Sequence, residues 1–400
     1  MKIRSLTYFI HPPAGLPAQI QAAAAHARSL SDALARAGVA VQTRRLATTP
    51  FPRWLDLEDP AAALRQAAQL EQTALAEGFN YTAIGPAGPL LPASFEILKQ
   101  VLTRTGLFAS ACLTHGQQLH PRACRASADI IHHLSAVEEH GFANLRFTAL
   151  GNVPAGSPFF PSAYAPADEM SFAIAVEGAD LAVAAFSNAG SIAEAQTNLA
   201  SRMLAAADLI TAQVQSANPK IPFTGLDMTL APFPDELTSI GAALEKLGVP
   251  ALGQAGSAAA AAVLMSAMQA VKYPRTGFNG LMLPVLEDSR LAQQAARGTL
   301  GVQDLLLYST LCGTGLDTIP LPGDVSEDQL TAILLDVAAI SLRLNKALTA
   351  RLMPIPGKLV GDRTDFDFAF FANSRVMNPD SAGVSGLLAG DEPFTILPRG

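Results

Sequence analysis

The segment from Leu307 to Asp324 carries more structural information than any other part of this sequence: Leu307-Tyr-Ser-Thr-Leu-Cys312-Gly-Thr-Gly315-Leu-Asp317-Thr-Ile-Pro320-Leu-Pro322-Gly-Asp324. An apolar run ends at a cysteine, and the glycines that follow permit a tight turn or a left-handed backbone. Two prolines then stiffen the exit, and two carboxylates accompany them. Because a plain core strand needs no such combination, we expect a site loop on a rigid scaffold.

Outward from this segment, strand-like and helix-like patterns alternate along the chain. Strands are predicted over Lys2 to Ile10, Gly277 to Leu286 and Phe366 to Ala372, and a helix from Ser326 to about Leu348. Alternation of this kind favours a parallel or mixed sheet covered by helices. Since no Ser/Gly-rich linker or internal repeat divides the chain, we expect a single α/β domain over residues 1–400.

The composition bears on the oligomeric state of the protein and on the partners that it can bind. Charged residues make up only 15% of the chain and hydrophobic residues 50%, whereas ordinary globular proteins have about 25% charged residues. So little charge is hard to spread over the surface of a monomer, and we therefore expect a large core and a homo-oligomer. The formal net charge of −7, without any basic run, argues against a nucleic-acid partner.

Features of the termini and of the cysteines predict a cytoplasmic protein without a membrane partner. Met1-Lys-Ile-Arg-Ser leads straight into a strand pattern and lacks the features of a secretory signal. The most hydrophobic run, Ala258 to Met268, is too short and alanine-rich to span a bilayer. Cys112, Cys124 and Cys312 contain no CxxC pair, which suits reduced thiols.

Carboxylates follow apolar runs at three predicted strand ends, at Asp227, Glu287 and Asp317. The carboxyl ends of parallel strands converge on a binding crevice, so these catalytic candidates can form an acid–base pair or bind a divalent cation. Asp288 and Asp324 are candidate ligands of Mg²⁺ or Ca²⁺. The alternative for each carboxylate is a helix N-cap, and it is strongest for Asp288, at a predicted helix start.

Other candidate site residues are a cysteine and several groups in glycine-rich loops. Cys312 is a nucleophile if its thiolate is stabilised by a helix N-terminus or a histidine, and otherwise a small buried hydrophobe. The candidates for substrate binding are Asn152, Gly156, Ser157, Glu169, Gly313 and Gly315.

Several established catalytic signatures are missing from the sequence. It has no GxSxG elbow and no GxxxxGK[ST] phosphate loop, and Gly313-Thr-Gly315 lacks the third glycine of a dinucleotide fingerprint. The histidines, such as His115 and the pair His132-His133, do not show HExxH spacing. We therefore expect no nucleotide cofactor.

Three motifs resemble those of the DUF711 (UPF0210) family: Ala149-Leu-Gly-Asn-Val-Pro-Ala-Gly-Ser-Pro-Phe-Phe-Pro161, Gly280-Leu-Met-Leu-Pro-Val-Leu-Glu-Asp288, and the stretch from Cys312 to Asp324. The resemblance extends over nearly the whole chain. It implies a fold similar to that of the pyruvate formate-lyase type of glycyl radical enzyme, a ten-stranded α/β barrel with a loop entering its centre.

The radical chemistry of those enzymes is not expected here. Glycyl radical enzymes carry an Arg-Val-x-Gly-aromatic motif near the carboxyl terminus, whereas this chain reads Arg375-Val-Met-Asn-Pro379. The later Gly383-Val-Ser-Gly386 also lacks the flanking residues. We therefore expect the barrel without a glycyl radical.

These observations favour a non-radical enzyme that acts on a small polar metabolite in the barrel mouth, by hydrolase or lyase chemistry. One alternative is a non-catalytic sensor or binding protein that uses the same pocket. Another is a structural homo-oligomer with a vestigial pocket. Ligands would raise the melting temperature of a binding protein without product formation, and would leave that of a structural protein unchanged.

Overall fold

A nine-stranded mixed sheet lies at the centre of the computed structural model, which describes residues 1–13, 15–166, 169–217, 220–311 and 313–399. In spatial order the strands are β10 (Gly315–Pro322), β11 (Leu348–Ile355), β7 (Phe147–Gly151), β4 (Phe108–Cys112), β3 (Tyr81–Ala87), β2 (Val41–Thr48), β1 (Lys2–Ile10), β8 (Ser171–Glu177) and β9 (Phe223–Asp227). A small second sheet contains β12 (Phe394–Thr395), β6 (Gln118–Leu119) and β5 (Thr114–His115).

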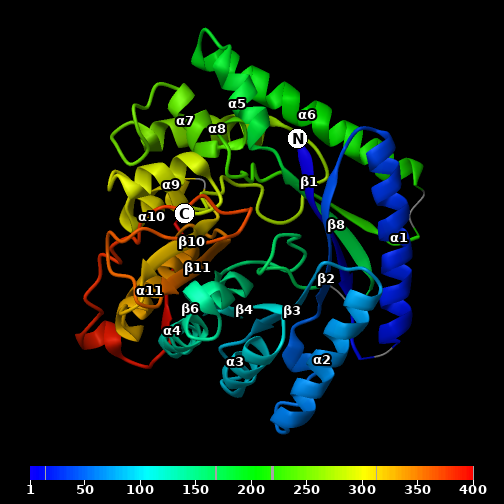
Figure 1. Ribbon diagram of the computed structural model, residues 1–400, viewed down its shortest axis with the longest axis vertical. Helices are drawn as coiled ribbons and strands as arrows, with labels where there is room; N and C mark the ends of the chain where they lie inside the picture. The colour runs from blue at the N-terminus through cyan, green and yellow to red at the C-terminus, as the bar shows by residue number, and fades with distance from the viewer. Residues whose placement is uncertain (14, 167–168, 218–219, 312, 400) are drawn as a thin grey trace.

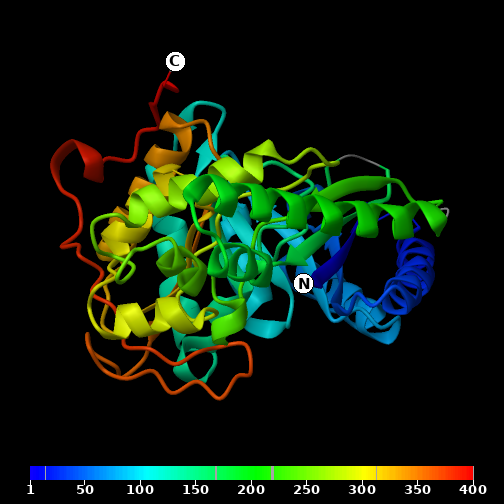
Figure 2. The ribbon, with the colours of Figure 1, turned by 90° about the horizontal axis from the view of Figure 1, so that it is seen from above.

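Helices lie around the outside of the molecule and the strands toward its middle (Figure 1). The α-helices are α1 (Leu16–Arg36), α2 (Pro60–Ala76), α3 (Ala93–Arg104), α4 (Pro121–Ser135), α5 (Ala179–Ser187), α6 (Ile192–Ser216), α7 (Ile240–Lys246), α8 (Ser257–Ala270), α9 (Ser289–Ala296), α10 (Val302–Leu311) and α11 (Glu327–Arg343). Short 3-10 helices are η1 (Phe51–Arg53), η2 (Glu139–Arg146), η3 (Glu236–Thr238) and η4 (Gly386–Ala389). Figure 2 shows the amino-terminal and carboxyl-terminal elements at opposite ends of the molecule. No helix in the described ranges is long and apolar enough to cross a membrane.

The strands fall into groups of parallel neighbours. β1, β2, β3, β4 and β7 are parallel to one another, as β8 is to β9 and β10 to β11. The groups meet at two antiparallel pairs, β1 with β8 and β7 with β11. Helices connect β1 to β4 in sequence, because parallel neighbours need a crossover connection. The α/β class and the mostly parallel sheet are thus as predicted.

The two edge strands of this sheet contact the same stretch of chain, residues 274–285. Leu226 in β9 forms an isolated parallel bridge with Arg275, and Asp317 in β10 forms one with Pro284. The described residues between these bridges do not form a regular strand, so the strand predicted over residues 277–286 is wrong. Positive φ angles of 74° at Gly277 and 46° at Asn279 interrupt it. As assigned, the nine strands leave two edges and do not form a closed barrel.

The segment that we expected to form a site loop instead contributes the end of α10 and the whole of β10. Pro320 and Pro322 are tolerated because β10 is an edge strand, where a missing N–H group costs no ladder hydrogen bond. Gly315, with φ of 109°, approaches Thr349 so closely that a Cβ would overlap the Thr349 backbone. Cys312, a candidate nucleophile, lies outside the described residues.

Candidate functional site

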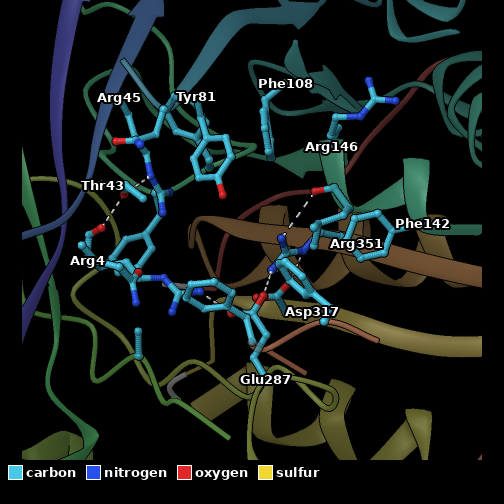
Figure 3. Close-up of a pocket in the computed structure, with 18 of the residues that line it drawn as sticks. Arg4, Thr43, Arg45, Tyr81, Phe108, Phe142, Arg146, Glu287, Asp317 and Arg351 are labelled. Carbon is cyan, nitrogen blue, oxygen red and sulfur yellow. Dashed lines mark hydrogen bonds and ion pairs between the residues drawn. The ribbon is translucent and has the colours of Figure 1, made fainter. Parts of the chain in front are cut away.

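A cavity of about 360 Å³ lies among the strands and is lined by aromatic and charged side chains (Figure 3). The aromatic lining residues are Tyr81, Phe108, Phe142, Phe159, Phe160, Phe368 and Phe370. The charged lining residues are Arg4, Arg45, Arg146, Arg351, Glu138, Glu287 and Asp317. Its size is within the range of small-molecule sites in proteins.

Two of the predicted carboxylates, Glu287 and Asp317, meet at one side of this cavity around Arg351. From β11, Arg351 donates through Nη2 to Glu287 Oε1 at 2.7 Å and through Nε to Asp317 Oδ1 at 2.6 Å. Arg4, from β1, pairs with Glu287 and also with Glu177, the latter at 3.1 Å. Glu287, Asp317 and Arg351 are 5%, 7% and 7% exposed. Strands far apart in the sequence therefore supply the positive charge for this carboxylate pair.

The surroundings move the pKa values of the two carboxyl groups in opposite directions. Burial raises the pKa of Asp317, attraction to Arg351 only partly offsets this effect, and repulsion from Glu287 adds to it. Burial also acts to raise the pKa of Glu287, but attraction to Arg4 and Arg351 outweighs it, so this pKa is below its usual value. One carboxylate is thus held ionised and its neighbour is suited to carry a proton.

Arg45, in β2, is a second type of buried cation in this cavity. It is only 6% exposed, and its Nε donates to Thr43 Oγ1 at 2.9 Å. Its guanidinium carbon is 5.2 Å from the ring centre of Phe160 and 5.5 Å from that of Tyr81. Among the described residues, no carboxylate lies within ion-pair distance of it. Burial, with repulsion from Arg4, lowers the pKa of Arg45 to about 9.

A loop near the carboxyl terminus brings Phe368 and Phe370 to the cavity. Its base is closed by the bond from Thr364 N to Ser374 O at 3.0 Å, while Phe366 N donates to Asn373 Oδ1 at 2.8 Å. The strand predicted over residues 366–372 is therefore wrong. The aromatic residues of this loop divide between a buried cluster and the cavity lining.

Comparison with known proteins places the chain in a family. Residues 1–373 match the profile of the family described as Uncharacterised ACR (DUF711). A UPF0210 protein of Pyrobaculum aerophilum is 32% identical over 352 residues, which cover 82% of this chain and 77% of the relative. UPF0210 proteins of Pyrobaculum arsenaticum and Acetivibrio thermocellus are 30% and 26% identical, over 82% of this chain and 76% and 77% of those relatives.

The chain belongs to the DUF711 (UPF0210) family. All the residues that line the cavity lie within the part of the chain that matches the family. The lining of the cavity thus belongs entirely to the DUF711 region.

Asp227, a predicted catalytic residue of this DUF711 protein, does not line the cavity. Its fully buried carboxylate accepts hydrogen bonds from Phe278 N at 2.7 Å, Asn279 N at 3.0 Å and both the N–H and the hydroxyl of Thr229. Gly277 passes so close to this carboxylate that a Cβ would overlap it. Asp227 therefore anchors the chain between the sheet edges, and the catalytic role predicted for it is withdrawn.

The two predicted metal ligands also lie elsewhere. Asp288 is the N-cap of α9 and bonds across to the start of α7, with Ser239 Oγ at 2.6 Å and Ile240 N at 2.6 Å. Asp324 is exposed at the surface. In the described part of the chain no three metal-ligating side chains gather. Because Glu287 and Asp317 already bind guanidinium groups, this donor set does not fit Mg²⁺ or Ca²⁺.

None of the predicted substrate-binding residues, all of which the structure describes, lines the cavity. Asn152 and Glu169 are exposed, and the buried Ser157 hydroxyl accepts a bond from Phe159 N at 3.4 Å. Gly156 donates its N–H to Tyr164 O at 2.9 Å. Gly313 and Gly315 instead permit close approach of Ser309 and Thr349. The loop of Asn152 still matters, because it carries Phe159 and Phe160 to the cavity wall.

Sequence reasoning missed the arginines Arg4, Arg45 and Arg351. Each is located within a strand, β1, β2 or β11, whose other residues are mostly buried. For Arg4 and Arg351, an arginine inside a largely apolar strand was the available signal, because an unpaired guanidinium is costly to bury. Arg45 gave no such signal, because β2 is mostly polar in sequence.

Proposed function

We propose that this DUF711 protein is an enzyme that catalyses proton transfer on a small molecule bound in the cavity. The observation that carries the proposal is the pairing of Asp317 with Glu287 around Arg351 on the cavity wall. Perturbed carboxyl groups in a cleft are typical of general acids and bases. The arrangement needs no metal cation, because the positive charges of the guanidinium groups balance the negative charges of the carboxylates.

Each member of the cluster has a distinct role in the proposed chemistry. Asp317 exchanges a proton with the substrate, since burial and the Glu287 charge favour its protonated form. Glu287 stays ionised and holds Arg351 and Arg4 in place. The Arg351 guanidinium orients Asp317 and can stabilise negative charge that develops on the substrate. Lyase and hydrolase reactions both use such a proton transfer.

The test is substrate turnover by matched variants. Mass spectrometry of a metabolite panel incubated with the protein identifies a consumed compound. Asp317→Asn keeps the shape of the side chain and should lower turnover at least about 100-fold, as loss of a general acid or base does. The control Asp324→Asn, at an exposed carboxylate, should leave turnover unchanged. Full turnover by Asp317→Asn would rule out the proposed role.

The second candidate function is ligand binding without catalysis, which the unpaired Arg45 favours. A buried cation in an aromatic pocket is suited to hold an anion whether or not a reaction follows. In that case a ligand raises the melting temperature of the protein, no product forms, and Asp317→Asn leaves the shift intact.

We also propose that residues 274–285 complete a ten-stranded barrel around the cavity, similar to that of glycyl radical enzymes. The support is that this stretch bridges to both β9 and β10. With this stretch included, β8, β9, β10 and β11 would join into one parallel group that meets the other, β1 to β4 with β7, at two antiparallel pairs, which suits such a barrel. An experimental structure in which residues 274–285 leave either edge strand would contradict it.

A cytoplasmic homo-oligomer remains our proposal for the state of the protein. Its support is the low charge content and the presence of exposed leucines, such as Leu237 at 74% and Leu387 at 100%. The free thiols Cys112 and Cys124 suit a reducing compartment. Sedimentation as a monomer at micromolar concentration would contradict the oligomer.

A further inference from the structure

We infer that the cavity binds an organic anion, whose carboxylate or phosphate group pairs with Arg45 and whose apolar body lies against the aromatic wall. This inference rests on the proposal that the cavity is the ligand site, and adds the chemical class of the ligand. The observation behind it is a buried guanidinium group in the cavity wall that lacks an anionic partner among the described residues.

Three carboxylates at or near the cavity already have arginine partners. Glu287 accepts from both Arg4 and Arg351, Asp317 accepts from Arg351, and Glu177 accepts from Arg4. None of them pairs with Arg45, whose side chain donates, among the described residues, only to the neutral hydroxyl of Thr43. Burying a charge without a counter-ion is unfavourable, so an anion from outside would relieve this cost.

The geometry of Arg45 suits recognition of a planar or tetrahedral anion. The bond to Thr43 occupies Nε, and within the described ranges the two terminal nitrogens have no hydrogen-bond acceptor. Such a fork can donate two parallel bonds to a carboxylate or a phosphate. The rings of Phe160 and Tyr81 flank the guanidinium and hold it in place. In Figure 3, Arg45 lies beside Tyr81 and Thr43, apart from the group formed by Glu287, Asp317 and Arg351.

The remaining wall determines what the rest of the ligand is like. Phe108 packs between Tyr81 and Phe160, with ring centres 5.1 and 5.5 Å away. Phe142 and Phe368, 5.1 Å apart, also face the cavity. This surface favours an aromatic or branched apolar body. The small polar metabolite expected from the sequence is therefore replaced by an amphipathic acid.

A charge series of compounds tests the inference on the full-length protein by calorimetry. Phenylacetate and phenyl phosphate carry the anion, phenylacetamide is the neutral counterpart, and phenethylamine is the cation. We expect the better of the two anions to bind at least about tenfold more tightly than the amide, since charge-assisted bonds are roughly twice as strong as neutral ones. Tighter binding of phenylacetate would identify the anionic group of the ligand as a carboxylate, and tighter binding of phenyl phosphate would identify it as a phosphate.

Variants of two neighbouring arginines locate the binding group. Arg45→Gln should reduce the affinity for the preferred anion to that for the amide, a loss of about tenfold or more. Arg44→Gln is the matched control, because Arg44 is the adjacent residue of β2 and does not line the cavity. It should leave the preference for the anion unchanged. Urea unfolding of both variants verifies that they are folded.

Several outcomes would overturn the inference and leave the proposed function intact. They are equal affinity for acid and amide, an unchanged preference in Arg45→Gln, and no binding by any of the four compounds. Acid–base catalysis would then still be supported by turnover of a neutral or cationic metabolite that Asp317→Asn abolishes. Conversely, anion binding through Arg45 without turnover of any compound would contradict the proposed catalysis and leave the anion site supported.

Discussion

Arg351 and Arg45 are both buried in the wall of one cavity, yet they have different partners. Arg351 bonds to two carboxylates, Glu287 and Asp317. Arg45 bonds to the Thr43 hydroxyl and lies between two aromatic rings. The two side chains are 7% and 6% exposed, so burial alone does not distinguish them.

The difference separates a cation that belongs to the scaffold from one that is available to a ligand. A paired guanidinium fixes the strands that supply its partners, and its removal leaves buried carboxylates unpaired. An unpaired guanidinium lowers the stability of the free protein and is retained where a bound anion offsets that cost. Variants at each position test this contrast.

The largest effect is expected for Arg351→Met. It leaves Asp317 without its guanidinium partner and Glu287 with Arg4 alone, so the free energy of unfolding should fall by about 3–5 kcal/mol. Urea unfolding monitored by circular dichroism measures it. The control Arg290→Met also loses two carboxylate partners, but its side chain is 26% exposed. It should cost no more than about 1 kcal/mol. Equal losses would remove the distinction between buried and exposed pairs.

Arg45→Met should change the free energy of unfolding in the opposite direction to Arg351→Met. Replacing an uncompensated buried cation by an apolar side chain of similar length should raise the free energy of unfolding by about 1–3 kcal/mol. The same denaturation experiment measures it, in the absence of ligand. A fall in stability of more than about 1 kcal/mol would show that Arg45 has a structural partner in the free protein.

The pH dependence of stability should distinguish the two carboxylates of the cluster. The lowered pKa of Glu287 contributes stability that is lost as the pH falls below the unfolded value of about 4.3 and through the folded one. The raised pKa of Asp317 has the opposite effect on the free energy of unfolding. It lowers stability above the folded pKa, and this cost disappears as the pH falls toward the unfolded pKa of about 3.9.

Glu287→Gln should therefore flatten the loss of stability in acid, and Asp317→Asn should make it steeper. Unfolding curves between pH 3 and 7 measure both slopes. The same change of slope in the two variants would show that the pKa values of these groups are not shifted in opposite directions.

The smallest effects concern the rings that hold Arg45. Tyr81→Phe retains the ring and should change stability by less than about 0.5 kcal/mol. Tyr81→Leu removes the contact between cation and ring and should cost about 0.5–2 kcal/mol. Thermal unfolding of the two variants measures the difference. Equal effects would mean that the ring does not stabilise the guanidinium.

Local patterns in the sequence predicted much of the scaffold. The strand predicted over Lys2 to Ile10 matches β1, because its apolar residues continue to the prolines that end it. The helix predicted from Ser326 matches α11, whose capping box joins Ser326 to Gln329. Patterns failed where long-range contacts override them, as in β10, whose prolines suggested a loop.

The site was predictable only in part, and one pair of neighbours shows why. Glu287 and Asp288 are adjacent and chemically alike, yet Glu287 pairs with arginines in the cavity and Asp288 caps α9 and binds the start of α7. The sequence identified Asp288 as a cap candidate, because a cap depends on residues close by in the chain.

The sequence by itself determined the α/β alternation and the family, because local periodicity and motifs are properties of short segments. The predicted meeting of Glu287 with Asp317 is confirmed, but not through strand ends, since Asp317 lies near the amino end of β10 and no regular strand precedes Glu287. Only the tertiary structure decided which cations reach them. Arg351 is 64 residues from Glu287 along the chain, and Arg4 is 283 residues away. Whether a buried arginine meets a carboxylate, as Arg351 does, or has none within reach among the described residues, as is the case for Arg45, depends on the strand order in space, which no local pattern encodes.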